Sequence, residues 1–594
     1  MTTTVAPSPD LSAGPTTLPA WLLLQSALRP KGIAMRVKEL GRWREISWQE
    51  HADRIESVGR ALASFGVGRG DRVLLLSENR PEWIVTDLAV QGLGASTVGV
   101  FPTTPVSEVG PLLERSGARV AVVEDEEQLD KLLEVRGGTA LERIVVVDTR
   151  GIRLLEDPAS SFDALEALGS RDAVELRSGD VDEWRVAVGR LAPDDIAAIA
   201  FTPGTSGEPK GALLTHANLA EVAQVGVTEY GLQPDDRIVS CLPLCEIAER
   251  VLVVAQATSA GCTVHFGEGG DALENDIREV RPTVFLGAPR LWQRLRSSVD
   301  LGLRNAGRLK RAAFRFGTGS GPRALRSLVA TGPVRRRVGL TRVRLALAGG
   351  APLPADLLAW WAALGVEVRE VYGLTETSGV GTIVTDATPT GSVGRAFPGT
   401  EVAISSDGEV LVRGRSVFAG YLDDSEETAA ALDREGWCHT GDLGSFDADG
   451  NLTIVGRRKD IIVTSGGHSV APAPIERRLA ATPFVRAAVV VGEGRPHLGA
   501  LLSLEGEAVG DWAAEQRLAF TTHAVLIALP EVQALVQDAI DAVNDGLPSE
   551  EQVRSFALLP EDLSEDDGAL TATLKVRRAT AAERFAELVE SMYA

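Results

Sequence analysis

The chain has 594 residues, more than a single hydrophobic core usually organises, so we expect at least two domains. Its composition, with 44% hydrophobic and 24% charged residues, is that of a globular protein in water. The net charge of −22 argues against a general binder of nucleic acid or of anionic membranes, since such a protein needs a basic face.

Cysteine usage and the first residues predict the compartment. The four cysteines show no metal-binding spacing with partner ligands, which is typical of a reduced cytoplasmic protein. No apolar run reaches the roughly 18 residues of a membrane-spanning helix, so we expect no membrane insertion. Residues 1–18 are rich in Thr, Pro and Ala and lack a basic start, which indicates a disordered tail rather than a signal peptide.

Residues 48–147 alternate between helical and strand patterns. A helical apolar spacing over 48–66 ends at glycines. Further helices are predicted at 81–90, 106–116 and 127–135, and strands at 72–77, 97–101, 120–123 and 143–147. This alternation predicts a parallel sheet with helices on its faces. The next segment, 155–192, is acidic and weakly patterned, and we expect a surface excursion there.

The alternation resumes after that segment. Strands are predicted at 196–201, 237–243, 263–266, 283–287, 342–348 and 367–371, and a helix at about 246–260. The Arg-rich stretch 303–337 is predicted to be helical. A solvated helix face is the preferred interpretation of it, and a phosphate-facing patch is the alternative.

From about residue 390 short strands are separated by Gly, Asp and Pro turns, at 401–405, 408–413, 443–446 and 451–455. Beyond them, strands (461–464, 486–491, 500–504) mix with helices (474–481, 530–544). The predicted fold class is α/β. A large N-terminal domain over 19–456 has parallel sheets covered by helices and a small β-barrel subdomain at about 390–456. A smaller α+β C-terminal domain follows over 457–594.

A glycine-rich run from Phe201 to His216 follows the strand at 196–201. Its glycines permit backbone shapes that other residues resist, and its hydroxyls and lysine can surround phosphate oxygens. The spacing is not that of a Walker A motif, and an ordinary surface turn is the alternative. Pro203 stands out because it has neither an amide N–H nor a hydroxyl. The candidate phosphate-binding residues are Thr202, Thr205, Ser206, Gly207 and Lys210.

Three further stretches carry chemistry. In the run from Tyr372 to Gly379, hydroxyls beside Glu376 suit phosphate and Mg²⁺, and the Tyr372 ring suits a base; a capped glycine turn is the alternative. Asp442, after Thr-Gly, can accept hydrogen bonds from ribose hydroxyls, although Thr-Gly-Asp is also a common turn. Near the end, Lys575 lies among apolar residues, where a solvated strand lysine is the alternative.

In this order and at these distances the motifs resemble the adenylate-forming superfamily, which includes acyl-CoA synthetases, nonribosomal adenylation domains and beetle luciferases. The resemblance covers about residues 40–590. It adds Gly349-Gly-Ala-Pro-Leu-Pro354 as the adenine and acyl-pocket strand end, Gly456–Asp460 as a hinge, and the glycine motif 466–476. The phrases at 242–250, 282–292 and 471–476 are most similar to the long-chain acyl-CoA synthetase branch.

The resemblance implies a ligase that joins a small-molecule carboxylic acid to coenzyme A in two half-reactions. The acid attacks the α-phosphate of ATP to give acyl-AMP, and then the mobile C-terminal domain rotates and the CoA thiol attacks. The implied cofactors are Mg²⁺, ATP or acyl-AMP, and coenzyme A. Lys575 and Glu376 would be catalytic, Glu376 would hold the metal, and Lys459 would be the hinge. The loop residues above, with Gly349, Gly350, Ala351, Tyr372, Gly373, Thr375, Asp442 and Arg457, would bind the nucleotide; Glu246, Gly466 and Gly467 would face the acyl and CoA side.

The chain departs from the family pattern where Pro203 replaces a serine, Glu246 replaces a histidine, and His468-Ser469 continue the glycine motif. Loss of one preorganised donor costs roughly 3 kcal/mol, or about 10²–10³ in rate. A carboxylate beside an incoming acid and triphosphate repels both. These departures lead to the hypothesis that adenylation is weak or absent while thioesterification survives. A separate adenylating enzyme would then supply the acyl-AMP, as in a specialised biosynthetic pathway.

Three alternatives stay open. In the first, the chain is a complete ATP-dependent, AMP-forming fatty acyl-CoA synthetase that tolerates these substitutions. In the second it is a non-catalytic nucleotide-binding protein. In the third it is a ligase that loads a carrier-protein pantetheine. Small residues around 225–260 and 345–351 predict a roomy apolar pocket, which suits a medium to long chain or a bulky polycyclic acid.

Overall fold

The structure is a computed structural model that describes residues 14–153, 155, 159–171, 182–202, 209–304, 306–318, 331–385, 388–564, 568–570 and 576–594. It divides into two compact units. The first comprises Met1–Pro352, Leu357–Ala403 and Leu411–Thr440, and the second Leu353–Asp356, Ile404–Val410 and Gly441–Ala594. The boundary predicted after residue 456 stays a prediction.

The first unit contains a seven-stranded sheet in the order β7-β6-β5-β3-β4-β8-β9. The neighbours are parallel except β8 and β9, which pair antiparallel. Both faces are covered, since Val73 and Leu75 of β3 belong to one core cluster and Leu74 and Leu76 to another. Strands buried on both faces have continuous apolar sequences, which is why β3, β4, β5, β6 and β8 could be predicted, whereas β7 and β9 were not. The bounds are β3 Arg72–Leu76, β4 Ser96–Val100, β5 Val120–Val123, β6 Arg143–Val146, β7 Ala159–Ser161, β8 Ile196–Thr202 and β9 Lys210–Thr215.

A second seven-stranded sheet of this unit has the order β14-β13-β12-β10-β11-β1-β2. Its pairs are parallel except β1 with β2, an antiparallel hairpin that the sequence analysis did not predict. The parallel sheets covered by helices are confirmed. The bounds are β1 Ile33–Glu39, β2 Arg42–Ser47, β10 Arg237–Ser240, β11 Thr263–Phe266, β12 Val284–Gly287, β13 Leu345–Ala348 and β14 Val368–Glu370.

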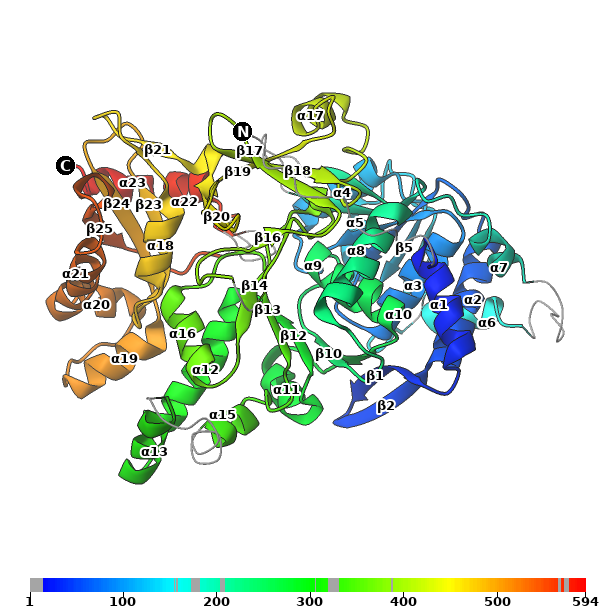
Figure 1. Ribbon diagram of the computed structural model, residues 1–594, viewed down its shortest axis with the longest axis horizontal. Helices are drawn as coiled ribbons and strands as arrows, with labels where there is room; N and C mark the ends of the chain where they lie inside the picture. The colour runs from blue at the N-terminus through cyan, green and yellow to red at the C-terminus, as the bar shows by residue number, and fades with distance from the viewer. Residues whose placement is uncertain are drawn as a thin grey trace. The chain divides into compact units, whose positions relative to one another are not determined.

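The helices of the first unit pack on these sheets and on one another (Figure 1). Helix α3 begins with Pro81, whose missing N–H costs nothing there, and it is buried along its whole length. Helix α8 begins with a capping box between Thr215 and Asn218. The helix predicted at 246–260 is present, but its centre is a π-helix, η1. The bounds are α1 Leu18–Leu28, α2 Trp48–Ser64, α3 Pro81–Gly92, α4 Val106–Ser116, α5 Glu126–Val135, α6 Phe162–Leu168, α7 Glu183–Val188, α8 His216–Tyr230, α9 Ile247–Glu249, η1 Arg250–Gln256, α10 Ala257–Ala260, η2 Gly270–Ala272, α11 Leu273–Val280, α12 Pro289–Arg304, α13 Arg308–Thr318, α15 Gly332–Arg337, α16 Ala355–Ala363, η4 Thr375–Thr377 and α17 Ser425–Ala431.

The surface excursion predicted at 155–192 is wrong for the part of it that the structure describes. This part forms β7, α6 and α7, and it buries Phe162, Leu165 and Trp184 in the main core cluster. The Trp184 indole N–H donates to the Ala89 carbonyl at 2.9 Å. A Cβ on Gly92 would lie 2.2 Å from the indole ring, so the absence of a side chain there makes room for it.

A four-stranded sheet, β17-β18-β19-β20, occupies the region predicted as a barrel-like subdomain. Strands β19 and β20 pair antiparallel, and the division between the two units passes along β17, β18 and β19. A short antiparallel pair, β15 and β16, precedes it. The bounds are β15 Thr382–Ile383, β16 Arg395–Ala396, β17 Thr400–Ile404, β18 Glu409–Gly414, β19 Cys438–Phe446 and β20 Leu452–Arg457.

The rest of the second unit is α+β, as predicted. Strands β23 and β24 pair antiparallel and β24 with β25 parallel, and a separate core cluster joins this sheet to α18 and α21. No helix among the described residues is long and apolar enough to cross a membrane. The bounds are η5 Arg458–Asp460, β21 Ile462–Val463, β22 Ser469–Val470, α18 Pro472–Ala480, β23 Val485–Val491, β24 Leu498–Leu504, α19 Gly506–Glu515, α20 His523–Ala528, α21 Pro530–Asn544, η6 Ser549–Glu551, β25 Val553–Leu558, α22 Arg578–Arg584 and α23 Ala586–Ser591.

Candidate functional site

The two ends of the predicted phosphate loop lie opposite each other on adjacent strands. Thr202 ends β8, Lys210 begins β9, and the two residues are paired in the antiparallel register. The Thr202 hydroxyl donates to the Lys210 carbonyl at 3.5 Å. Residues 203–208 between them lie outside the described residues. They include Pro203, Thr205, Ser206 and Gly207, so the proposed roles of these residues stay predictions.

Lys210 is buried, with 7% of its surface exposed, and its ammonium group contacts Glu427 and Tyr421. Its Nζ lies 2.5 Å from Oε2 of Glu427 in the first turn of α17, and 5.4 Å from the centre of the Tyr421 ring. The chain before α17 brings both partners close because it pairs with β9, where the Leu213 N–H donates to the Gly420 carbonyl at 2.9 Å. The predicted phosphate-binding cation is therefore held by a carboxylate and an aromatic ring.

Tyr421 connects Lys210 to Glu376. The Tyr421 hydroxyl donates to Glu376 Oε1 at 2.6 Å, and the Phe418 N–H donates to the Glu376 carbonyl at 2.9 Å. Burial first, and then the nearby Glu376 carboxylate, raise the pKa of Tyr421 well above its ordinary value. The phenol therefore stays protonated and acts as a donor. Tyr421 and Glu427 were not predicted from the sequence, because no local pattern marks an aromatic or acidic residue that contacts a strand some 200 residues earlier.

The loop that carries Tyr372 and Glu376 is compact. Its backbone comes so close to itself that a Cβ on Gly373 would lie 2.4 Å from the carbonyl of Gly379. The Thr377 hydroxyl accepts from the Leu374 N–H at 2.9 Å and caps the single 3₁₀ turn of η4, which contains Thr375 and Glu376. The glycine is a steric requirement, and the capped turn presents the candidate functional side chains.

The strand end at Gly349–Ala351 lies near the 242–250 phrase. Gly350 has a φ of +85°, which favours glycine. A Cβ built on Gly350 would lie 3.8 Å from Glu246 Oε1. Similarly, Ile247 Cγ1 lies 3.3 Å from the Cβ position of Gly379. The first unit thus brings together Glu246, the 349–351 strand end and the Tyr372–Gly379 loop.

Three residues after Glu246, the Glu249 carboxyl group is buried. Its Oε1 accepts from the Ser240 hydroxyl at 2.8 Å and from the Cys241 N–H at 2.9 Å. Burial raises the pKa of Glu249 to about 8, against an ordinary value of 4.5. At neutral pH this carboxyl is therefore mostly protonated.

The neighbouring Arg250 is buried at the start of the π-helix. Its guanidinium forms an ion pair with Asp87 of α3, donates to the Thr97 hydroxyl at 2.6 Å and lies 5.2 Å from the Trp83 ring centre. Glu249 and Arg250 are both buried inside the unit. Of the two acidic residues in the 242–250 phrase, Glu246 is therefore the one nearer the surface.

In the second unit, Asp442 and Arg457 lie opposite each other on β19 and β20. Arg457 Nε is 3.0 Å from Asp442 Oδ1, and Asp442 is only 4% exposed. The arginine thereby fixes the orientation of the carboxylate that was predicted to accept ribose hydroxyls. Lys459, the predicted hinge residue, lies in the 3₁₀ turn η5 directly after this pair.

The predicted glycine motif forms the turn between β21 and β22. The Thr464 N–H donates to the His468 carbonyl at 3.0 Å, and the Gly467 N–H donates to the Thr464 carbonyl at 2.8 Å. Gly467 has a φ of +80°, so a left-handed turn places Gly466 and Gly467 at its tip. The proposed contact of this tip with CoA stays a prediction.

Lys575 lies outside the described residues, but the chain on either side of it is anchored. Leu570 and Val576 form an antiparallel bridge, and the Arg577 N–H donates to the Ala569 carbonyl at 2.8 Å. The Arg578 guanidinium forms a two-point ion pair with Glu476 of α18, with 3.0 Å between Nη2 and Oε2. This pair holds the chain three residues after the predicted catalytic lysine.

The described residues offer a metal ion few protein ligands at any one place. Among the described residues no group of three or more His, Cys, Asp or Glu side chains is placed to bind a metal. Mg²⁺ commonly binds one or two carboxylates together with substrate phosphates and water, and one oriented carboxylate such as Glu376 fits that donor set.

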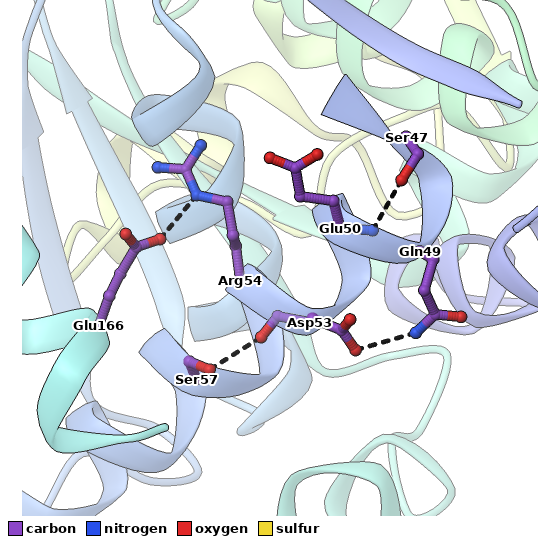
Figure 2. A pocket seen from close by; sticks show the side chains of 7 residues that line it. All are labelled: Ser47, Gln49, Glu50, Asp53, Arg54, Ser57 and Glu166. Carbon is purple, nitrogen blue, oxygen red and sulfur yellow. Dashed lines mark hydrogen bonds and ion pairs between the residues drawn. The ribbon is translucent and has the colours of Figure 1, made fainter. Parts of the chain in front are cut away.

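A hollow at the start of α2 contains none of the predicted site residues (Figure 2). In Figure 2 Arg54 and Glu166 point toward each other, with 2.7 Å between Nε and Oε1. Arg54 also lies 2.9 Å from Glu82. Because this cation is already paired with two carboxylates, we assign the hollow no role. Its lining residues are Ser47, Gln49, Glu50, Asp53, Arg54, Ser57 and Glu166.

Comparison with known proteins identifies the family. The chain matches the AMP-binding enzyme family over residues 24–422 and the AMP-binding enzyme C-terminal domain over residues 459–594. It is 34% identical over 577 residues to the long-chain-fatty-acid–CoA ligase FadD15 of Mycobacterium tuberculosis, covering 93% of both chains. It is 31% identical to the peroxisomal long chain acyl-CoA synthetase 7 of Arabidopsis thaliana, covering 95% of this chain and 84% of the relative.

The fold matches solved structures as well. The crystal structure of the anthranilate CoA ligase AuaEII with anthranoyl-AMP aligns with a TM-score of 0.75 at 22% identity, covering 98% of this chain and all of the other. ATP-bound MatB from Rhodopseudomonas palustris aligns with a TM-score of 0.71 at 23% identity, covering 96% and 99%. The chain therefore belongs to the AMP-binding enzymes of the adenylate-forming superfamily, within the long chain acyl-CoA synthetase-like branch of its acid–thiol ligases.

Proposed function

We propose that the protein is a long-chain fatty acyl-CoA ligase that carries out both half-reactions. The observation that carries this proposal is the Lys210–Tyr421–Glu376 network at the end of the predicted phosphate loop. It offers a cation for phosphate oxygens and an oriented carboxylate for Mg²⁺. The proposed acid class is supported by the relatives, of which one is named a long-chain-fatty-acid–CoA ligase and another a long chain acyl-CoA synthetase.

In the first half-reaction an anionic carboxylate must approach an anionic phosphate, so positive charge and oriented donors are needed where charge accumulates. Lys210 and the loop hydroxyls would bind the phosphates, Glu376 would hold Mg²⁺, which would neutralise phosphate charge, and Lys575 is proposed to stabilise the charge on the reacting oxygens. Tyr372 stacks on the adenine at the Gly349–Ala351 strand end. Asp442, fixed by Arg457, binds the ribose hydroxyls.

In the second half-reaction the thiol of coenzyme A attacks the acyl carbonyl carbon and AMP leaves. Lys459 is proposed as the point where a few backbone dihedrals absorb a rotation of the C-terminal domain. Glu246 and the Gly466-Gly467 turn then face the acyl and CoA side. The four cysteines are free thiols, which supports a reducing compartment such as the cytoplasm.

A second candidate function is transfer of a preformed acyl-adenylate to CoA without efficient ATP use. It is favoured by Pro203 in the phosphate loop and by Glu246, whose carboxylate lies beside Gly350 at the proposed acyl pocket. In that case a separate adenylating enzyme would make the substrate. The second half-reaction would remain with Lys459 and the C-terminal domain.

Two assays on the full chain separate these functions. One measures pyrophosphate release from MgATP and hexadecanoic acid; the other measures hexadecanoyl-CoA formed from synthetic hexadecanoyl-AMP and coenzyme A. The proposed function predicts activity in both assays. Activity in the second alone supports the second candidate, and activity in neither contradicts both and supports a non-catalytic nucleotide-binding protein. Replacing CoA with a pantetheine-bearing carrier protein tests the other acceptor.

A further inference from the structure

The Lys210–Glu427 ion pair carries a consequence for ATP binding. We propose that Glu427 is a counter-ion that the phosphates of ATP displace, and that it is a positioning residue that sets the affinity for ATP. Glu427 holds the Lys210 ammonium while no nucleotide is bound. This inference rests on the proposed function, because it takes Lys210 to be a phosphate-binding residue.

The burial of Lys210 explains why it needs a counter-ion. Its side chain is 8% exposed, and a buried cation without a partner is strongly unfavourable. The Tyr421 ring, 5.4 Å from Nζ, supplies some of that stabilisation but no negative charge. The Glu427 carboxylate, 2.5 Å from Nζ, supplies the charge.

The two partners differ in how easily they can move. Lys210 belongs to β9, which is paired with β8 along its length, and its position is therefore fixed by the sheet. Glu427 belongs to α17, a helix of seven residues with no buried residue, and its side chain is 33% exposed. When phosphate oxygens approach Lys210, Glu427 is the partner that can rotate into water.

Electrostatics favour this exchange. A triphosphate brings several negative charges to Lys210, and a carboxylate that stayed in contact with Nζ would repel them. Glu376 is already linked to the same Tyr421 and adds a second carboxylate close by. ATP therefore binds in competition with Glu427. The apparent affinity of the protein for ATP is lowered because ATP binds productively only to the fraction of molecules in which Glu427 has left Lys210.

The chain contains a matched control one residue away. Glu426 lies on the same helix α17 and is exposed, while Glu427 is half-buried. Glu426→Gln removes the same charge from the same helix without touching the ion pair. Glutamine at 427 also retains the backbone N–H of residue 427, which the Asp424 side chain accepts at 3.0 Å to cap the helix.

The test uses the full chain with MgATP as the probe. Titration calorimetry gives the Kd for ATP of the wild type, Glu427→Gln and Glu426→Gln, and thermal unfolding gives the Tm of each with and without MgATP. We expect Glu427→Gln to bind ATP about three- to tenfold more tightly. Its Tm should be lowered without nucleotide and restored by saturating MgATP, and Glu426→Gln should match the wild type.

The contrary outcomes are distinct. If the wild type binds ATP but Glu427→Gln binds it with equal or lower affinity, the pair persists in the complex and the inference is wrong, while the proposed function stands. If Glu426→Gln tightens binding as much as Glu427→Gln, the effect is one of general charge and the inference is again wrong. If the wild type does not bind ATP, both the inference and the ATP-dependent proposed function fail.

Discussion

The Tyr421 hydroxyl donates a hydrogen bond of 2.6 Å to Glu376 Oε1, and the same tyrosine ring lies beside the Lys210 ammonium group. Two motifs that are more than 150 residues apart, the phosphate loop and the Tyr-Gly-Leu-Thr-Glu loop, are therefore joined through one side chain. Tyr421 orients the proposed metal ligand and packs on the proposed phosphate ligand. The first unit thus couples the position of the metal to that of the phosphates.

Tyr421→Phe tests this coupling. The ring beside Lys210 remains, but Glu376 loses a hydrogen bond to a charged group, which is worth about 1.5–3 kcal/mol. We expect pyrophosphate release from MgATP and hexadecanoic acid to fall about 10- to 100-fold in kcat/KM. Tyr230→Phe, in the same unit but outside the network, should behave as wild type. An unchanged kcat/KM in Tyr421→Phe would mean that Glu376 needs no such orientation.

Gly373→Ala tests the steric requirement in the same loop. The new Cβ would lie 2.4 Å from the Gly379 carbonyl, so the backbone must shift and carry Tyr372 and Glu376 with it. Overpacking of this kind costs about 1–3 kcal/mol. We expect a lower Tm and weaker AMP binding, measured by calorimetry. The control is Gly381→Ala, whose Cβ meets Tyr372 at an ordinary 3.4 Å; equal effects of the two variants would refute the argument.

Asp442→Asn tests the proposed ribose contact. Asparagine keeps the volume but removes the charge, so both the ribose hydroxyls and Arg457, now 3.0 Å from the carboxylate, lose a charged acceptor. Each charged hydrogen bond is worth about 1.5–3 kcal/mol, and we expect the Kd for AMP to rise at least tenfold. Asp449→Asn, in an exposed turn after the same strand, is the control. AMP binding that is equal in both variants would remove Asp442 from the nucleotide site.

The fold was largely predictable where strands and helices are long and periodic. The strand predicted at 72–77 is β3, and the helix predicted at 106–116 is α4 with the same bounds. These elements bury continuous or one-sided apolar patterns, so their sequences reflect their environment directly. The segment 155–192 was mispredicted because its buried residues are spread over two short helices between acidic residues, and only the tertiary contact with α3 reveals Trp184 as a core residue.

The candidate site was predictable only where a motif is local. The glycines of the 372–379 loop and the Asp442–Arg457 pair lie within or between adjacent elements, and their sequence patterns mark them. Tyr421 and Glu427 could not be found in this way. Their contact with Lys210 depends on the pairing of residues 419–422 with β9, which is a long-range relationship that no local spacing encodes.

Trp184→Ala tests the correction to the fold. The indole is 1% exposed and fills a space left by two glycines, so its removal leaves a cavity in the main core. We expect the free energy of unfolding of the first unit to fall by about 3–5 kcal/mol, measured by urea denaturation followed by circular dichroism. Trp437→Ala, which removes a half-buried indole, should cost clearly less. If Trp184→Ala lowers the free energy of unfolding by less than Trp437→Ala does, Trp184 is not a core residue and the surface excursion predicted for this segment stands.

Glu249→Gln tests the buried carboxyl through its pH dependence. The pKa of Glu249 is about 8 in the folded chain against 4.5 when exposed, so between these values the folded state holds a proton that the unfolded chain releases. Wild-type stability therefore falls as pH rises through this window, by at most about 1.4 kcal/mol per pH unit.

Glutamine cannot release a proton, and it retains an oxygen to accept from the Ser240 hydroxyl and the Cys241 N–H. Thermal unfolding at pH 5, 6.5 and 8 should show the variant gaining stability relative to the wild type as pH rises. Glu114→Gln, an exposed position on α4, should follow the wild type at every pH. Parallel pH curves for Glu249→Gln and the wild type would mean that the carboxyl is ionised in the folded protein, with its charge compensated within the core.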